Sequence, residues 1–324
     1  MKGTRRLGST DYAISPIGMG CLQFAQGQGM AGRIYSPLDA ATTTEIVGKA
    51  LAGRVNWFDT AETYGGGASE RALSTALQEN GVAPDEVMIA TKWAPWLRRA
   101  ATIEHTIGDR IEALQGYPVC LHQIHGPRGS LSSLPAQLRA MARLARQHRI
   151  GAIGVSDFSA RQLREAAQIL RDEGIALAAN QTRISLLDRD IEHNGVLQAA
   201  RDLGITLIAY SPLCRGVLTG RLHEDPARVE ALSRTRRRLN PHLRGQGLIR
   251  TAPLIDELRA IAQTYGVSVA QVALNWLISF YGDTVVAIPG ASQPCQAEEA
   301  AAAMDFTLTD KELQRLAEVS ERVR

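Results

Sequence analysis

The chain has 324 residues, of which 45% are hydrophobic and 5% aromatic, and its formal net charge is +3. This composition excludes a disordered chain, and the balance of charge gives no reason to expect nucleic acid as a partner. The N-terminal stretch is polar, and no apolar run reaches the length of about 18 residues that spans a bilayer. We therefore expect no signal peptide, no membrane contact and a cytoplasmic location.

The four cysteines give no sign of a disulfide framework or a zinc ribbon. Cys21, Cys120, Cys214 and Cys295 lie far apart, and none forms a CxxC pair. We expect reduced thiols. The sequence shows no heptad repeat, and the oligomeric state stays open.

Short apolar segments alternate with helical segments along the chain. Each short segment is apolar on both faces, which is typical of parallel strands covered by helices. The pattern predicts strands over Ile17–Cys21, Val55–Asp59, Val87–Lys92, Val119–His125, Ala152–Ser156, Ala176–Gln181, Thr206–Tyr210 and Thr284–Ile288. It predicts helices over Ala40–Ala52, Ser69–Gln78, Ile103–Leu114, Pro135–Gln147, Ala160–Glu173, Gly195–Asp202, Pro253–Gly266 and Ser268–Ser279, and a last helical turn over Ala297–Ala303.

Eight such pairs favour a (β/α)8 TIM barrel in the α/β class, and we expect one domain over residues 1–324. The alternative is a doubly wound open sheet, which needs a G-x-G-x-x-G turn after an early strand. The only glycine-rich run, Gly65–Gly67, follows the second strand and lacks the third glycine at that spacing.

The extra length falls in a segment of about forty residues after the seventh strand, Leu213–Ala252. Two interpretations stay open: a solvated surface loop, or a lid over the barrel mouth that meets anionic groups. The segment carries Arg215, Arg221, Arg228, Arg234, Arg236, Arg237, Arg238, Arg244 and Arg250.

Polar residues gather at the carboxyl ends of the predicted strands, where barrel enzymes carry their chemistry. Asp59, Lys92 and His125 end neighbouring strands, and Tyr64 lies in the loop that follows Asp59. An Asp beside a Lys in the barrel mouth should form an ion pair, because an unpaired buried charge is costly. The ammonium should lower the pKa of the Tyr64 phenol and make it a better proton donor. Each residue alone also has a structural interpretation as a cap, a packing group or a buried histidine.

A metal site is not expected. His122 and His125 are three residues apart on a predicted strand, so they point to opposite faces. The remaining histidines fall on predicted helices or loops.

These residues stand in motifs that resemble the aldo-keto reductase superfamily along nearly the whole chain. The motifs include an opening hairpin and first strand from Leu7 to Gly20 and the segments Phe58–Gly65, Ile89–Lys92, Gln123–Pro127, Gly154–Phe158, Asn180–Gln181, Ala209–Leu213 and Ile288–Ser292. The Pro289-Gly290-Ala291 form is more similar to the bacterial and channel-β-subunit-like branches.

The resemblance implies a barrel with an N-terminal hairpin and a nicotinamide cofactor bound across its mouth. It gives Tyr64 the role of proton donor, His125 that of orienting a carbonyl, and Lys92 paired with Asp59 that of tuning Tyr64. The implied cofactor contacts are Cys21, Leu22, Asp59, Ser156, Asp157, Gln181, Tyr210, Ser211, Pro212, Leu213, Arg215, Gly216, Leu218, Gly220, Arg221, Ile288, Gly290, Ser292, Gln296 and Glu299.

The implied substrate is a small carbonyl compound that contacts Tyr64, His125 and two tryptophans, Trp93 and Trp96. Rim packing is the alternative interpretation for the tryptophans.

Three residues depart from the family pattern. Asp157 replaces a usual Asn, Gln296 stands where many members have an Arg for the 2′-phosphate, and Ala300 replaces a usual Asn. The family favours NADP, with NAD as the alternative. The expected activity is reduction of an aldehyde or ketone. The alternatives are a cofactor-binding regulatory protein of the channel-β-subunit type, and an oxidising or redox-neutral sugar-type enzyme with tightly bound NADP.

Overall fold

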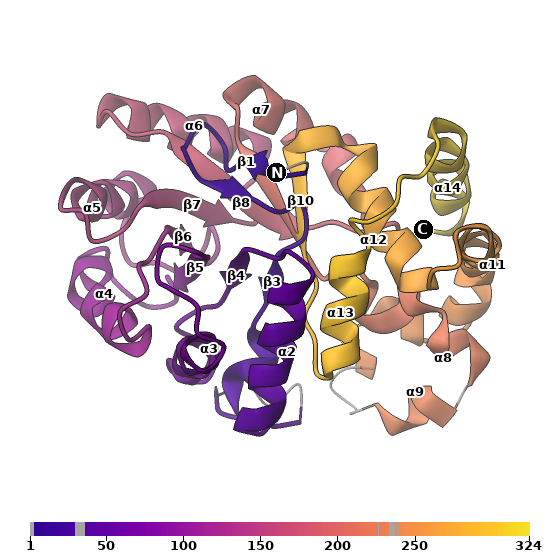
Figure 1. Cartoon of the computed structure of the whole chain (residues 1–324). Helices are drawn as coiled ribbons and strands as arrows, with labels where there is room; N and C mark the ends of the chain where they lie inside the picture. Colours follow the sequence, from indigo (N-terminus) through magenta and orange to yellow (C-terminus); the bar gives the residue numbers. More distant parts are fainter. Residues whose placement is uncertain (1–2, 30–35, 226, 233–236, 239) are drawn as a thin grey trace.

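Eight parallel strands form a barrel at the centre of the computed structural model (Figure 1), which describes residues 3–29, 36–225, 227–232, 237–238 and 240–324. Neighbouring strands pair in chain order, and parallel bridges from Ile17 to Ala287 and from Gly20 to Gly290 join the first strand to the last. The strands are β3 (Met19–Gly20), β4 (Trp57–Asp59), β5 (Met88–Trp93), β6 (Leu121–Ile124), β7 (Ala152–Ser156), β8 (Leu177–Arg183), β9 (Thr206–Tyr210) and β10 (Val285–Ile288).

Helices surround the strands, as the alternating pattern predicts. Most predicted helix boundaries agree with the structure to within two residues. The helices are α2 (Ala40–Ala52), α3 (Ala68–Glu79), α4 (Ala101–Ala113), α5 (Leu134–Arg146), α6 (Ala160–Asp172), α7 (Val196–Leu203), α11 (Gly247–Tyr265), α12 (Val269–Phe280), α13 (Pro294–Ala302) and α14 (Asp310–Val323).

Three predictions near the C-terminus are wrong. The segment predicted as a last helical turn from Ala297 is helix α13, which begins at Pro294. Helix α11 begins at Gly247, six residues before the predicted start at Pro253, which lies inside the helix. Its first turn is held by Thr251, whose hydroxyl donates to the Gly247 carbonyl and lies 2.9 Å from Nε2 of His223. Helix α14 was not predicted, although Thr309 and Glu312 form a capping box that marks its start.

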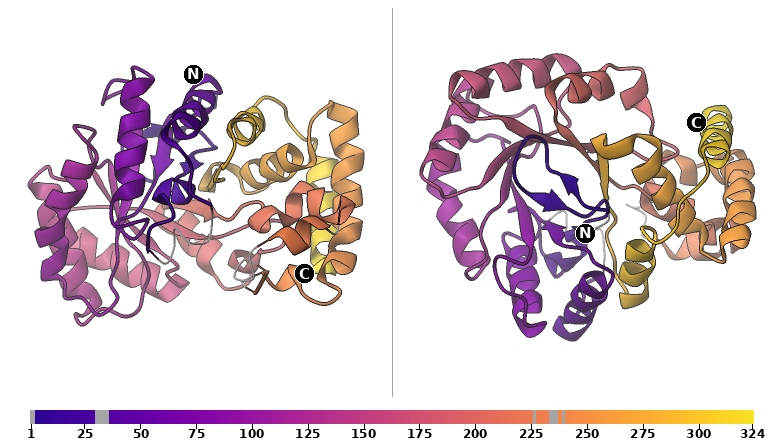
Figure 2. Two further views of the ribbon diagram at one scale, coloured as in Figure 1. Left: turned by 90° about the horizontal axis from the view of Figure 1, so that it is seen from below. Right: turned by 45° about the horizontal axis from the view of Figure 1, so that its top comes forward.

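A two-stranded hairpin closes the amino-terminal end of the barrel (Figure 2). Strands β1 (Arg5–Arg6) and β2 (Ala13–Ile14) pair antiparallel, so the expected hairpin is confirmed. Leu7 and Ile14 from this hairpin are fully buried among side chains that fill the barrel, including Trp57 and Ile208. The hairpin thus excludes water from one end, and the other end is left for a site.

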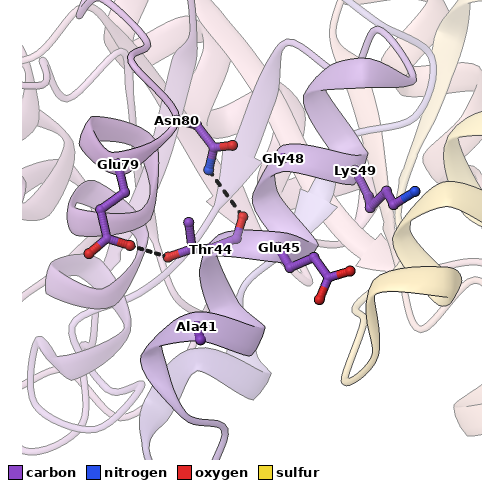
Figure 3. Close-up of a pocket in the computed structure, with 7 residues that line it drawn as sticks. All are labelled: Ala41, Thr44, Glu45, Gly48, Lys49, Glu79 and Asn80. Carbon is purple, nitrogen blue, oxygen red and sulfur yellow. Dashed lines mark hydrogen bonds between the residues drawn. The ribbon is translucent and has the colours of Figure 1, made fainter.

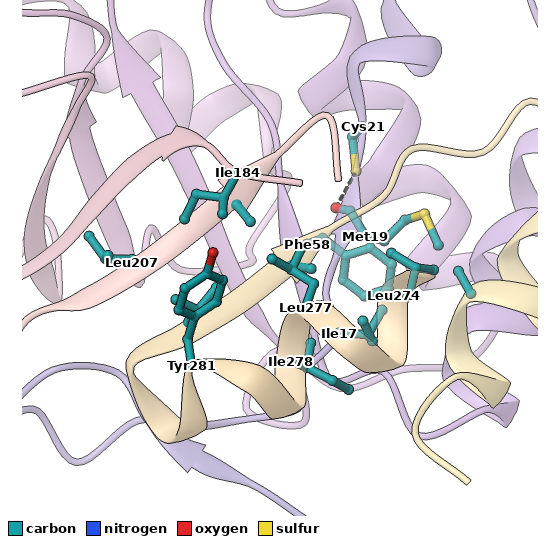
Figure 4. Packing of buried hydrophobic residues seen from close by; sticks show 14 of the residues in the cluster. Ile17, Met19, Cys21, Phe58, Ile184, Leu207, Leu274, Leu277, Ile278 and Tyr281 are labelled. Atoms are coloured by element: carbon teal, nitrogen blue, oxygen red, sulfur yellow. Dashed lines mark hydrogen bonds between the residues drawn. The ribbon is translucent and has the colours of Figure 1, made fainter. Parts of the chain in front are cut away.

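A second apolar layer lies between the strands and the helices (Figure 4). Figure 4 shows Phe58 on the strand side close to Leu274 and Leu277 of α12, and each of these side chains is fully buried. Every second side chain of a strand packs outward into this layer, so the residues between them point into the barrel.

The arginine-rich segment after β9 contains short helices rather than one open loop. It holds α8 (Arg221–Glu224), α9 (Ala227–Ala231) and two 3-10 turns, Cys214–Thr219 and Pro241–Leu243. Arg234 and Arg236 lie outside the described residues. Among the others, Arg228, Arg237, Arg238, Arg244 and Arg250 are exposed to solvent.

No helix in the described part of the chain is both long enough and apolar enough to cross a membrane.

Candidate active site

A cavity of about 490 Å³ opens at the carboxyl ends of the strands, opposite the hairpin. Size and position are those of a ligand site in this architecture. Its lining comes from several strand ends, from the segment after β9 and from α12 and α13. The lining residues are Gly20, Cys21, Leu22, Gln23, Asp59, Tyr64, Trp96, His125, Ser156, Asp157, Gln181, Tyr210, Ser211, Pro212, Leu213, Arg215, Gly216, Thr219, Arg221, Ala270, Leu274, Ile288, Pro289, Gly290, Ser292, Gln296, Glu299 and Ala300.

A buried ion pair lies beneath this cavity. Asp59 ends β4 and Lys92 lies on the adjacent strand β5, and the Lys92 Nζ donates to Asp59 Oδ1 at 2.5 Å. The Lys92 side chain is fully buried and that of Asp59 is 2% exposed. The amides of Gln123 and Gln181 donate to the other carboxylate oxygen at 3.0 and 2.8 Å. The expected Asp–Lys pair is confirmed, and its carboxylate is fully satisfied.

The hydroxyl of Tyr64 lies next to this pair. Lys92 Nζ donates to it at 3.5 Å and lies 5.0 Å from the ring centroid. Burial raises the pKa of Tyr64, and Lys92 lowers it without cancelling that rise. The lowering by the ammonium is thus present as predicted, but burial outweighs it, because a phenolate loses its hydration in this site. Burial also lowers the pKa of Lys92, but Asp59 and Tyr64 raise it, and the net shift is upward.

His125 faces Tyr64 across the cavity. The two rings meet edge to face with centroids 5.9 Å apart, and the Trp96 ring is tilted against the imidazole at 5.5 Å. Burial, with a smaller contribution from Lys92, lowers the pKa of His125 to about 3. The imidazole is therefore neutral near pH 7. Its Nδ1 lies 3.4 Å from the hydroxyl of Thr63.

Glu62 anchors the loop that carries Tyr64, and sequence reasoning missed it. One carboxylate oxygen accepts from the Ala94 N–H at 2.5 Å and from Arg98, and the other lies 3.7 Å from Arg110. These contacts join the Tyr64 loop to the segment that carries Trp96. The motif of residues 58–65 contains Glu62, but only the structure shows its partners.

The ends of β7, β8 and β9 form one wall of the cavity. Asp157 follows Ser156 with φ +55°, and its N–H donates to the Gln181 carbonyl at 2.8 Å. The hydroxyls of Tyr210 and Thr182 donate to the Asp157 carboxylate at 3.3 Å. Ring, hydroxyl, amide and carboxylate groups thus face the cavity together.

Charged and hydroxyl groups line the opposite end of the cavity. Arg221 pairs with Glu299 at 3.6 Å, and Arg215 also lines this end. The Gln296 side-chain oxygen accepts from the N–H and the hydroxyl of Ser292 at 2.8 and 3.2 Å. This end can therefore bind phosphate groups through cations and hydroxyls.

Most residues named from the resemblance line this cavity, and Leu218, Gly220 and Trp93 do not. Leu218 is fully buried and Gly220 packs against Ile255 and Val269, and neither is among the residues that line the cavity. Trp93 is 1% exposed and its indole N–H donates to Thr102, so it belongs to the core and not to a substrate wall. Lys92 lies behind the wall. Sequence reasoning did not assign Gly20, Gln23, Thr219, Ala270 and Leu274 to the site.

His122 lies on the opposite face of β6 from the cavity, as its spacing from His125 predicts. Burial, together with the charges of Arg110 and Arg98, lowers the pKa of His122 to about 3. In the described part of the chain no three His, Cys, Asp or Glu side chains come together as a metal site.

A second hollow lies on the outer surface between α2 and α3 (Figure 3). Three of its residues bond to one another: the Thr44 hydroxyl donates to Glu79 at 2.5 Å, and the Asn80 amide donates to the Thr44 carbonyl at 3.0 Å. It is open to solvent and far from the strand ends, so the chemistry is placed in the cavity at the barrel mouth. The hollow is lined by Ala41, Thr44, Glu45, Gly48, Lys49, Glu79 and Asn80.

The sequence profile of the aldo/keto reductase family matches residues 16–321. The chain belongs to the aldo/keto reductase family. An uncharacterised oxidoreductase of Mycobacterium tuberculosis is 37% identical over 298 residues, 91% of this chain and 86% of that protein. The chloroplastic pyridoxal reductase of Arabidopsis thaliana is 29% identical over 93% of this chain and 81% of its own length.

A solved structure of the same family, the glycerol dehydrogenase of Gluconobacter oxydans, superposes with a TM-score of 0.83. It is 27% identical, and the match covers 100% of this chain and 97% of that chain. This aldo/keto reductase is therefore an oxidoreductase on a (β/α)8 barrel, as the resemblance implies.

Proposed function

We propose that this aldo/keto reductase reduces an aldehyde or ketone to an alcohol with NADPH, with Tyr64 as general acid. One observation carries the proposal: the Tyr64 hydroxyl lines the cavity and lies 3.5 Å from an ammonium that is itself fully buried against Asp59. This arrangement provides a proton at one point of the cavity and stabilises the anion left behind.

The residues of the cavity fit a nicotinamide dinucleotide. Arg215 provides positive charge for a pyrophosphate, and Tyr210 provides a ring face beside Ser156 and Gln181. The side-chain oxygen of Gln23 is buried in the cavity wall without a hydrogen-bond partner, so an acceptor is left for a bound group. When bound, the reduced nicotinamide supplies the hydride that forms the new C–H bond of the alcohol.

Tyr64 and His125 act on the carbonyl oxygen in this proposal. Tyr64 gives its proton to the oxygen as negative charge develops there, and Lys92 stabilises the phenolate that remains. Asp59 holds the ammonium in place. His125 is neutral, so when its Nδ1 accepts from Thr63 its proton is on Nε2, free to orient the carbonyl. Trp96 is 53% exposed and extends the apolar rim on that side, which favours a substrate with an apolar or ring-bearing part.

The choice of NADP over NAD rests on Ser292 and Arg221. Both line the end of the cavity expected to take the adenosine, and both can donate to a 2′-phosphate. Gln296 provides no charge there and holds Ser292 through its side-chain oxygen. Titration with NADPH and with NADH, followed by intrinsic fluorescence, tests the choice. Tighter binding of NADH would assign NAD instead.

The replacement of Tyr64 by Phe tests the mechanism. We expect turnover of a carbonyl panel to fall by about 10²- to 10⁴-fold while NADPH binding persists. Tyr265→Phe is the matched control, because that hydroxyl donates to Glu312 on α14, away from the cavity. Unchanged turnover in Tyr64→Phe would refute the role of Tyr64. A wild-type protein that binds NADPH but reduces no carbonyl would favour a regulatory function.

Oxidation of an alcohol by the same groups in reverse is a second candidate. The similarity to a glycerol dehydrogenase over the whole chain favours it. The ratio of initial rates in the two directions, with matched alcohol and carbonyl pairs, discriminates between these activities.

A further inference from the structure

Three carboxylates line the cavity, and they differ in how their charge is balanced. Asp59 is paired with the ammonium of Lys92, and Glu299 with the guanidinium of Arg221. Asp157 instead accepts from two neutral hydroxyls, those of Tyr210 and Thr182. Among the described residues, no cation lies within the 4 Å ion-pair distance of Asp157.

The guanidinium of Arg183 acts on the Asp157 carboxylate without forming an ion pair with it. The guanidinium carbon of Arg183 lies 5.8 Å from the Tyr210 ring centroid, and its charge acts on Asp157 only at longer range. Burial raises the pKa of Asp157, and the hydrogen bonds from Tyr210 and Thr182 and the charge of Arg183 oppose that rise. The side chain is exposed at the cavity mouth, which favours the ionised carboxylate at neutral pH. The wall formed by Ser156, Asp157, Gln181 and Tyr210 therefore carries a net negative charge at Asp157.

The main chain at Asp157 lies next to the residues that hold the reacting groups. The Asp157 N–H donates to the Gln181 carbonyl, and the Gln181 amide donates to Asp59 at 2.8 Å. Asp59 in turn holds Lys92 beside Tyr64. Asp157 thus flanks the part of the cavity in which the proposed hydride transfer takes place.

We infer that Asp157 makes the site bind the oxidised nicotinamide cofactor in preference to the reduced one, and so sets its redox balance. The inference rests on the proposed function, because it requires that the cavity binds this cofactor. The oxidised ring carries a positive charge that the reduced ring lacks, so a fixed carboxylate on the adjacent wall stabilises the oxidised form selectively. By linkage, this preference makes the bound reduced cofactor a stronger hydride donor.

Asp157→Asn is a clean perturbation of this charge. Asn is nearly isosteric, keeps an oxygen that accepts from Tyr210 and Thr182, and tolerates the φ of +55° that this position requires. The matched control is Glu299→Gln, which removes the same charge from the other end of the cavity. That change should alter the affinity for both forms together, because the adenosine end is the same in each.

The experiment measures the dissociation constants of NADP⁺ and NADPH by calorimetry at pH 7 for the wild type and both variants. We expect Asp157→Asn to weaken NADP⁺ relative to NADPH by about three- to tenfold, and Glu299→Gln to leave this ratio unchanged. An unchanged ratio in Asp157→Asn, or the same change in both variants, would overturn the inference while the cofactor site stands. If the wild type binds neither NADP⁺, NADPH, NAD⁺ nor NADH, the proposed function fails, and the inference fails with it.

Discussion

The buried pair of Lys92 and Asp59 predicts that stability and activity can be separated by removing one charge or both. In Lys92→Met, the apolar side chain fills much of the same space and leaves the Asp59 carboxylate buried without its cation. Loss of one partner of a buried pair costs about 3–5 kcal/mol. The amides of Gln123 and Gln181 still donate to Asp59, so we expect a value near the lower limit of that range.

The double variant Asp59→Asn/Lys92→Met removes both charges, and its side chains are close in volume to the originals. Replacement of a whole buried pair is often neutral, so we expect its free energy of unfolding to lie within about 1.5 kcal/mol of the wild type. The interaction energy from the double-mutant cycle should then be at least about 2 kcal/mol. Turnover should stay about 10²- to 10⁴-fold below the wild type in both variants, because neither carries the ammonium beside Tyr64.

Urea unfolding followed by tryptophan fluorescence measures stability, and single-turnover oxidation of NADPH with a carbonyl substrate measures activity. If the double variant is as unstable as Lys92→Met, the loss of unfolding free energy in Lys92→Met does not come from the unpaired charge of Asp59. Recovery of turnover together with stability would refute the role of Lys92 in catalysis and leave it a structural residue.

Three further predictions concern other parts of the site and the core. Between about pH 6.5 and 3, unfolded His122 binds a proton that the folded form excludes, so His122 should lower the free energy of unfolding by about 1.4 kcal/mol for each unit by which the pH falls. His125, whose pKa is lowered to the same value, should add an equal slope, and His122→Gln should remove only the share of His122 in urea titrations at several pH values. Gly18→Ala should lower the free energy of unfolding by about 1–3 kcal/mol, because the added methyl group would lie 2.3 Å from the Trp57 ring. An unchanged thermal unfolding temperature would contradict this prediction. Glu62→Gln should lower kcat more than it raises KM and leave NADPH affinity unchanged, because Glu62 anchors the loop that carries Tyr64. Glu79→Gln, on the outer surface, is the control, and an equal loss of kcat in that variant would indicate a general structural effect.

The fold and the four proposed reacting residues were predictable because local patterns specify them. Short strands that are apolar on both faces require covering helices, and parallel strands bring their carboxyl ends to one side of the barrel. Asp59, Lys92 and His125 therefore meet without any knowledge of the helices between them. The same rule of alternation could have corrected Trp93: since Lys92 points into the barrel, its neighbour on β5 must point outward.

Other features depend on contacts that no local pattern encodes. The pKa of Tyr64 reflects a balance between burial and one ammonium, and the extent of burial is set by elements far apart in the chain. The anchoring of Glu62 needs Arg98 and Arg110, which become its neighbours only in the folded barrel. Helix α14, in contrast, carried its own start signal at Thr309 and Glu312.

Gln181 can bind a cofactor and contact Asp59 at the same time. The resemblance expects its side chain to hold the cofactor, whereas in this structure its amide nitrogen donates to Asp59 at 2.8 Å. A primary amide has two N–H donors and one acceptor oxygen, so this bond leaves one N–H and the oxygen for a group in the cavity. A cofactor bound to them would be joined through Gln181 and Asp59 to Lys92. Gln181 would then contact the hydride donor and also hold Asp59, which positions Lys92 beside Tyr64. The hydride and the proton would therefore be delivered by groups that one hydrogen-bonded network positions.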